Sequence, residues 1–204
     1  NLYHAMTDYF VLNQLNSEEF AWEIQRLCFQ YPTHVSRHMY NLIDSHDTPR
    51  FLYQTGGKKE LLKLAYVFLM TYTGAPSIYY GDEVGMTGGQ DPDCRRPMIW
   101  DEKKQDTELL NFMKKLIRLR KEHRILRNDG DIRFLPSDNP DLLLYQRFAE
   151  DEVYTVIMNR SKDRQWLNLP KDLANKTYYD LWHEEEVALS EKTELMPYGF
   201  YIFK

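Results

Sequence analysis

The sequence predicts two parts of different fold class, an α/β part over residues 1–127 and an all-β part over residues 128–204. Two observations divide the chain there. In the first part, short apolar runs alternate with amphipathic helical segments, which is the pattern of βα units on a parallel sheet. In the second part, short strand-like runs follow one another with polar turns between them, which predicts an antiparallel β-sandwich.

Apolar spacing defines the elements of the first part. In chain order they are a helix from an N-cap at Ser17 to a stop at Pro32, a strand over 39–44, a helix over 58–72, a strand over 76–80 and a helix over 106–121. About three βα units fit into this length, whereas a complete eight-unit barrel needs about 250 residues. We therefore expect the first part to be the last portion of a barrel.

The second part contains five predicted strands. These are Leu142–Phe148, Val153–Met158, Gln165–Leu169, Thr177–Trp182 and Tyr198–Phe203. A short polar link joins the first two, which is a hairpin signal. A β-domain of this length buries little surface by itself, so we expect it to dock on the first part.

Composition excludes several classes of protein. The chain has 26 Lys and Arg against 31 Asp and Glu and no basic tract, which argues against nucleic acid as a partner. The longest apolar stretch is too short to span a membrane. Cys28 and Cys94 form neither a disulfide framework nor a zinc pattern, so free thiols and a cytoplasmic location are expected. The chain begins at Asn1 without an initiator methionine, so we expect it to be part of a longer protein.

One motif carries chemistry. An apolar strand leads directly into the pair His46-Asp47, and residues at the carboxyl ends of barrel strands face the mouth of the active site. A carboxylate there can stabilise positive charge that develops on a sugar ring, and a neighbouring histidine can donate hydrogen bonds to ring hydroxyls. Taken alone, such a pair is more often an N-cap or a surface pair.

Three linked segments give the motif its context. The segments NLIDSHDTPRFL, APSIYYGDEVGM and GGQDPDCRRPMIW, in this order and spacing, resemble the last part of α-amylase-family glycoside hydrolases. The resemblance is strongest to the neopullulanase, cyclomaltodextrinase and maltogenic amylase group, and in the β-domain it rests on position. It implies the C-terminal part of a (β/α)8 TIM barrel followed by an antiparallel β-sandwich domain. It also implies retaining hydrolysis of maltooligosaccharides, cyclodextrins or pullulan, with no cofactor, and no calcium site is indicated.

The resemblance implies roles for four residues. Asp47 would be the catalytic transition-state stabiliser, and His46 would bind hydroxyls of the sugar at the cleaved bond. Asp91 and Arg95 fall on the family's Asp-x-x-x-Arg pair, which holds a glucose one or two units from the cut. A carboxylate and a guanidinium can each grip vicinal hydroxyls. The alternative is a mutual salt bridge that orders the loop.

The family's nucleophile and acid/base lie on earlier strands, and no segment of this sequence matches either motif. We therefore expect the chain by itself to be inactive. We expect it to form homo-oligomers or to associate with the missing half of the barrel, since open sheet edges pair with whatever is available.

Other residues near the motifs have simpler interpretations. Asp44 is expected to be structural, and Arg50 and Arg96 to tie loops together. Core packing is expected for Tyr79 and Trp100.

Two other functions stay open. A glucanotransferase of the same family would share every residue visible here. A non-catalytic, amylase-like carbohydrate-binding or scaffold protein is the other alternative, and the retention of the four site residues argues against it.

Overall fold

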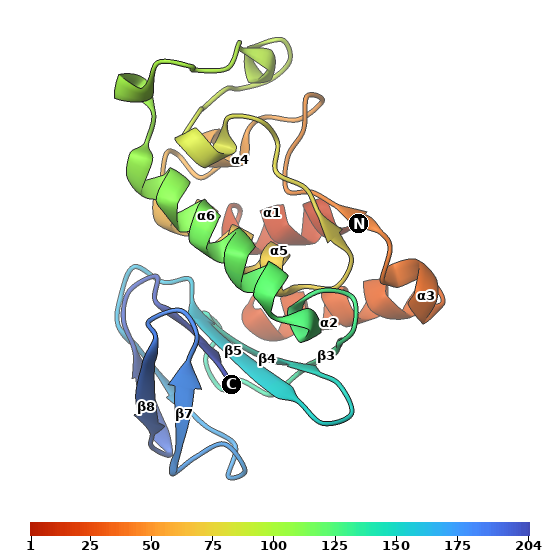
Figure 1. Ribbon diagram of the computed structural model, residues 1–204, viewed down its shortest axis with the longest axis vertical. Coiled ribbons are helices and arrows are strands. Elements are labelled where there is room, and N and C mark those ends of the chain that lie inside the picture. Colours follow the sequence, from red (N-terminus) through yellow and green to blue (C-terminus); the bar gives the residue numbers. More distant parts are fainter.

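A computed structural model describes residues 1–204, and it places a helical part above an antiparallel β part (Figure 1). The helical part consists of α1 (Leu2–Phe10), α2 (Ser17–Phe29), α3 (Thr33–Ser36), β1 (Tyr40–Asn41), α4 (Phe51–Gln54), α5 (Lys59–Thr71), β2 (Ala75–Pro76) and α6 (Thr107–Glu122). Four short 3-10 helices complete it: η1 (Asp82–Val84), η2 (Asp93–Arg95), η3 (Glu102–Lys104) and η4 (Arg124–Leu126). None of the helices combines the length and apolar character needed to cross a lipid bilayer.

The strands β1 and β2 are neighbours and run parallel, with Tyr40 opposite Ala75. This arrangement confirms the parallel sheet, but the strands are shorter than predicted and only two are present. The estimate of about three βα units was wrong because α1 and α2 follow one another without a strand between them. Gly74 sits between α5 and β2, where a Cβ atom would meet Asn41 Nδ2 at 2.4 Å and Met39 O at 2.7 Å. Only glycine therefore allows β1 to approach β2 this closely.

The three predicted helices of the first part are confirmed as α2, α5 and α6, but the predicted N-cap of α2 was wrong. Asn16 is the N-cap. Its side chain accepts from the Glu19 amide at 2.9 Å, and the Glu19 side chain accepts from the Asn16 amide at 2.8 Å, which is a capping box. The Ser17 hydroxyl donates instead to Asn139 O at 2.9 Å. A residue that would serve as a local cap thus joins α2 to the β part.

The β part contains a six-stranded antiparallel sheet of order β3-β4-β5-β10-β7-β8 and a two-stranded sheet, β6-β9. The strands are β3 (Asp131–Phe134), β4 (Leu142–Phe148), β5 (Val153–Asn159), β6 (Gln165–Asn168), β7 (Lys176–Asp180), β8 (Glu185–Leu189), β9 (Lys192–Leu195) and β10 (Phe200–Phe203). Their inner faces share a cluster of buried side chains that includes Leu144, Ile157 and Phe203. The antiparallel sandwich and its β4–β5 hairpin are therefore confirmed, whereas β3, β8 and β9 were not predicted.

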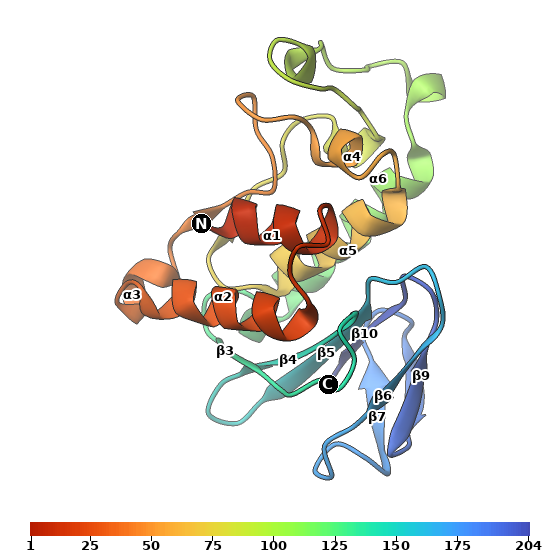
Figure 2. The same ribbon diagram turned by 180° about the vertical axis from the view of Figure 1, so that it is seen from behind.

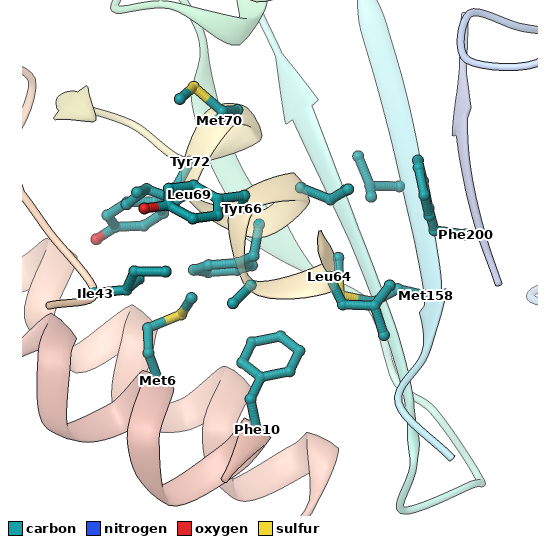
Figure 3. Close-up of a cluster of buried hydrophobic side chains, with 14 of the residues drawn as sticks. Met6, Phe10, Ile43, Leu64, Tyr66, Leu69, Met70, Tyr72, Met158 and Phe200 are labelled. Atoms are coloured by element: carbon teal, nitrogen blue, oxygen red, sulfur yellow. The ribbon is translucent and has the colours of Figure 1, made fainter. Parts of the chain in front are cut away.

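One core joins the two parts. Figure 3 shows side chains of α1 (Met6 and Phe10), α5 (Leu64 and Tyr66) and the β part (Met158 and Phe200) in the same cluster. Within this cluster, the ring of Phe68 packs edge-on against Phe20 and Tyr145, with centroid distances of 5.0 and 5.5 Å. Figure 2 shows α2 lying along β3 and β4 on the far side of the molecule. The β part is docked on the helical part, as predicted.

Two buried arginines lie at this junction and donate mainly to main-chain oxygens. Arg120 of α6 donates to the carbonyl oxygens of Met70, Tyr72, Gly74 and Leu126. Arg147 of β4 donates to those of Thr71, Leu126, Arg127, Gly130 and Asp131. Burial lowers the pKa of each guanidinium to about 10. Both cations lie at the carboxyl end of α5, where the helix dipole and free carbonyl groups favour positive charge.

Replacement of Arg147 by alanine should destabilise the protein strongly. The substitution leaves buried carbonyl groups without donors, and each such group costs about 1–3 kcal/mol. We expect the free energy of unfolding in urea to fall by about 3 kcal/mol or more. The control is Arg164→Ala, which removes only an exposed pair with Glu194 and should cost less than about 1 kcal/mol. Equal losses in the two variants would contradict the importance of the junction.

Candidate active site

The candidate site is formed by the two loops that follow β1 and β2. Since these strands are parallel neighbours, their carboxyl ends lie at the same edge, and the chain leaves both at that edge. The loop after β1 carries His46 and Asp47, and the loop after β2 carries Asp91 and Arg95. Residues that are 48 positions apart in sequence therefore meet in space.

Arg95 brings the four predicted residues together. Its Nη2 atom lies 3.2 Å from Asp47 Oδ1, and its Nε atom lies 2.8 Å from Asp91 Oδ1. The same Nε donates to the main-chain oxygen of His46 at 2.9 Å, and His46 Nε2 lies 3.3 Å from Asp47 Oδ1. The four side chains form one continuous polar edge in which a single guanidinium holds two carboxylates.

All four side chains are open to solvent. Between 46% and 69% of the surface of each is exposed. The structure contains the ion pair between Asp91 and Arg95 that was expected as the alternative to sugar binding. Exposed pairs of this kind are worth at most about 1 kcal/mol. Both side chains can therefore exchange this contact for hydrogen bonds to hydroxyl groups at little cost.

Asp93 and Arg96 order the loop beneath the edge. The Asp93 carboxylate accepts from the Gly89 amide at 2.6 Å and from Arg96 Nε at 2.7 Å. The Gly89 amide and then Arg96 lower the pKa of Asp93. At Gly88, a Cβ atom would meet Asp93 O at 2.6 Å, so the loop closes only with glycine there. Arg96 ties this loop together, as predicted.

A buried network lies behind the exposed edge. Asp44 Oδ2 accepts from the Phe51 amide at the start of α4 at 2.7 Å. Asp82 accepts from the Tyr66 hydroxyl at 2.6 Å and from Arg50 Nη1 at 3.1 Å. Burial, followed by the negative charge of Asp44, raises the pKa of Asp82 well above its usual range, against the lowering effects of Tyr66 and Arg50. The structural role predicted for Asp44 agrees with this position.

Two of the aromatic residues near the site pack against Arg50, whereas a third is exposed to solvent. The rings of Tyr79 and Tyr80 pack against each other and against the Arg50 guanidinium, whose carbon lies 4.3 and 4.9 Å from the two ring centroids. The Tyr80 hydroxyl also donates to Arg96 O at 2.8 Å. The core position predicted for Trp100 was wrong: it lies in the irregular segment between η2 and η3, and its side chain is 81% exposed because little of it is covered by other residues.

Sequence reasoning missed Asp82 and Tyr66. Each is a polar group next to apolar sequence, and this could have indicated a buried polar pair. Asp82 is an acidic residue that follows the predicted strand 76–80, and Tyr66 carries a hydroxyl in the middle of the most buried helix, α5. Nowhere do three or more His, Cys, Asp or Glu side chains come together in a way that could hold a metal ion. Cys94 is buried, and its thiol donates to His46 O at 3.3 Å.

Comparison with known proteins shows which family the chain belongs to. Residues 2–129 match the family model described as "Alpha amylase, catalytic domain", and residues 132–202 match "Maltogenic Amylase, C-terminal domain". The chain belongs to the α-amylase family.

Curated relatives agree with the group that the sequence indicated. A cyclomaltodextrinase of Geobacillus thermopakistaniensis is 40% identical over 203 residues, which are 98% of this chain and 34% of the relative. Neopullulanase 2 of Thermoactinomyces vulgaris is 41% identical over 197 residues, which are 93% of this chain and 33% of the relative. The chain thus spans about a third of the length of the curated relatives it matches.

The fold comparison gives the same result. A solved cyclomaltodextrinase superposes with a TM-score of 0.90 and 35% identity over 100% of this chain and 36% of that structure. The α-amylase-family resemblance and the expected fold, a portion of the barrel followed by an antiparallel β-domain, are confirmed.

The buried Asp82 should make stability depend on pH. Between the ordinary carboxyl pKa of about 4 and the raised pKa of Asp82, the folded chain keeps a proton that the unfolded chain has lost. The contribution of Asp82 to stability is therefore complete below about pH 4 and decreases as the pH rises. Asp82→Asn cannot titrate, so the stability of this variant relative to the wild type should rise with pH.

Urea unfolding at several pH values between about 4 and 7 measures this difference. The same substitution at the exposed Asp163 is the control. A difference between Asp82→Asn and the wild type that stays constant, or that falls with pH, would contradict the buried protonated carboxyl.

Proposed function

We propose that this chain is the C-terminal portion of a retaining α-glucan glycoside hydrolase that acts on maltooligosaccharides, cyclodextrins or pullulan. The observation that carries the proposal is the double contact of Arg95 with Asp47 and Asp91. It unites the carboxylate proposed to act at the reacting centre with the pair proposed to grip a neighbouring sugar. Relatives named cyclomaltodextrinase and neopullulanase support the substrate class.

Each residue has a distinct part in this proposal. The negative charge of Asp47 stabilises the oxocarbenium-like transition state, and the His46 ring donates a hydrogen bond to a hydroxyl of the sugar at the cleaved bond. Asp91 and Arg95 hold a sugar further from the cut. A retaining reaction also needs a nucleophile and an acid/base about 5–5.5 Å apart, which this sequence does not supply. We therefore propose that the chain by itself is inactive.

The two alternative functions are distinguished by the products. A glucanotransferase passes the glycosyl group to a second sugar instead of to water, so it yields longer oligosaccharides, whereas a hydrolase yields glucose and maltose. A scaffold protein gives neither. The relatives named above are hydrolases by name, which favours hydrolysis. We also propose a cytoplasmic location, because a relative 30% identical to this chain is named "Intracellular maltogenic amylase".

We propose that a second copy of the chain, or the rest of the barrel, covers the outer side of β1. Phe29 and Tyr40 expose 86% and 69% of their surface, and Tyr40 lines a cavity of about 410 Å³ together with Leu27 and the start of α1. Light scattering on the 204-residue chain should therefore show oligomers. A monodisperse monomer at high concentration would contradict this proposal, and Tyr40→Ser should shift the distribution toward the monomer.

The substitution Asp47→Asn in the full-length enzyme tests the proposed function. The change is nearly isosteric, so the fold should persist, but it removes a negative charge that matters most in the transition state. We expect kcat to fall by about 10²–10³, with a smaller change in KM. Hydrolysis of β-cyclodextrin and maltotriose, with circular dichroism as the check on folding, measures both constants.

Two controls accompany this test. Asp91→Ala should raise KM and change the cleavage position more than it lowers kcat, because Asp91 is proposed to hold a sugar remote from the cut. The 204-residue chain alone should show no turnover. If Asp47→Asn kept more than about a tenth of the wild-type kcat, a change below about 1.4 kcal/mol, Asp47 would be a structural carboxylate.

A further inference from the structure

Arg50 is completely buried between the two loops that carry the candidate site. Its Nη1 atom donates to Tyr80 O at 2.7 Å and to Asp82 Oδ1 at 3.1 Å, and its Nε atom donates to Cys94 O at 3.1 Å. Its main-chain amide donates to Gly88 O at 2.9 Å. Arg50 belongs to the loop after β1, yet every one of these acceptors lies in the loop after β2. A single residue therefore fastens one loop to the other.

Two neighbouring rings also pack against the guanidinium, and both lie on the same side of it. The ring centroids of Tyr79 and Tyr80 are 4.3 and 4.9 Å from its carbon and 4.6 Å from each other. The Tyr66 hydroxyl donates to Asp82, the acidic partner of Arg50, at 2.6 Å. Packing against aromatic rings while donating in the plane is a property of the flat arginine head group. A lysine ammonium cannot reproduce it.

These contacts continue directly to the exposed edge. Cys94, whose oxygen Arg50 holds, is the residue before Arg95, and Arg50 lies three positions after Asp47. The Cys94 thiol and Arg95 Nε both donate to His46 O, at 3.3 and 2.9 Å. Any shift of Arg50 relative to Cys94 would thus change the separation of Arg95 and Asp47. Because Arg50 has no exposed surface, it can influence a sugar only through these neighbours.

We propose that Arg50 is a positioning residue, which through Cys94 and Asp82 sets the distance between Asp47 and the Asp91–Arg95 pair. The predicted effects on kcat and KM rest on the proposed glycosidase function, whereas the predicted ordering of the two loops does not. A displacement of about 1 Å at a catalytic group can cost about 10²-fold in rate, so a buried residue of this kind affects both kcat and KM.

The test is Arg50→Lys in the full-length enzyme, with Arg160→Lys as the matched control. Arg160 is also buried, also donates to main-chain oxygens and to a carboxylate, Asp141, and also packs against a ring, that of Tyr9, but none of these partners belongs to the two site loops. After correction for the folded fraction, kcat/KM should fall about 10²-fold for Arg50→Lys and less than twofold for Arg160→Lys. In the double variant with Asp47→Asn, most of the Arg50→Lys effect on kcat should disappear, since both changes act on the same carboxylate.

Hydrogen exchange supplies a readout that needs no activity. Arg50→Lys should accelerate exchange of the amides in residues 45–48 and 88–96, whereas Arg160→Lys should not. If Arg50→Lys does not fold, Tyr79→Leu removes one stacking ring, keeps the hydrogen bonds of the guanidinium, and should give the same pattern in weaker form. Equal exchange in these segments for the Arg50 and Arg160 variants, or full additivity with Asp47→Asn, overturns the proposal. An enzyme with no turnover in the wild type overturns only the proposed function, because the exchange result still decides the role of Arg50.

Discussion

The carboxyl end of α5 is the point on which the rest of the structure depends. Helix α5 is the most buried helix, and its last carbonyl groups face the β part instead of water. A helix end without partners would be costly there, since each unsatisfied carbonyl carries a desolvation penalty. Arg120 and Arg147 supply the donors, one from each part of the chain. The same two side chains therefore supply hydrogen bonds to the last carbonyl groups of α5 and join the two parts of the chain.

A short segment of chain connects this junction to the candidate site. Gly74 and β2 come immediately after the helix end, and β2 pairs with β1, so the orientation of α5 fixes the edge at which both loops leave the sheet. The core shared by α1, α5 and the β part then prevents this edge from moving relative to the β domain. The β part contributes no residue to the exposed edge, and its role here is to hold the helix that aims the loops.

The site combines two electrostatic environments a few residues apart. Asp47 and Asp91 are exposed carboxylates shared by one arginine, whereas Asp44 and Asp82 are buried carboxylates behind them. Burial favours the neutral form of a carboxyl, and proximity to a second carboxylate increases this effect. The buried pair can therefore give rigidity through Tyr66 and Arg50 without adding a second full negative charge behind the edge. The exposed pair lies in front of it, in contact with solvent.

The sequence by itself determined those features that depend on near neighbours. Apolar spacing was enough for α2, α5 and α6, and two strand-like runs with a short polar link were enough for the β4–β5 hairpin. The three linked segments were enough for the family and for the four residues of the edge. The tertiary structure alone decided which polar residues are buried and with whom. Ser17 bonds across to Asn139 instead of capping its helix, Trp100 stays in solvent because other residues cover little of it, and Asp82 finds Tyr66 and Arg50 across the sheet edge. The charged strands β8 and β9 form because a neighbouring strand accepts their hydrogen bonds, which no local pattern records. The physical reason is common to all of these: periodicity is a local property of the chain, whereas the free energy of a buried polar group depends on partners that only folding brings close.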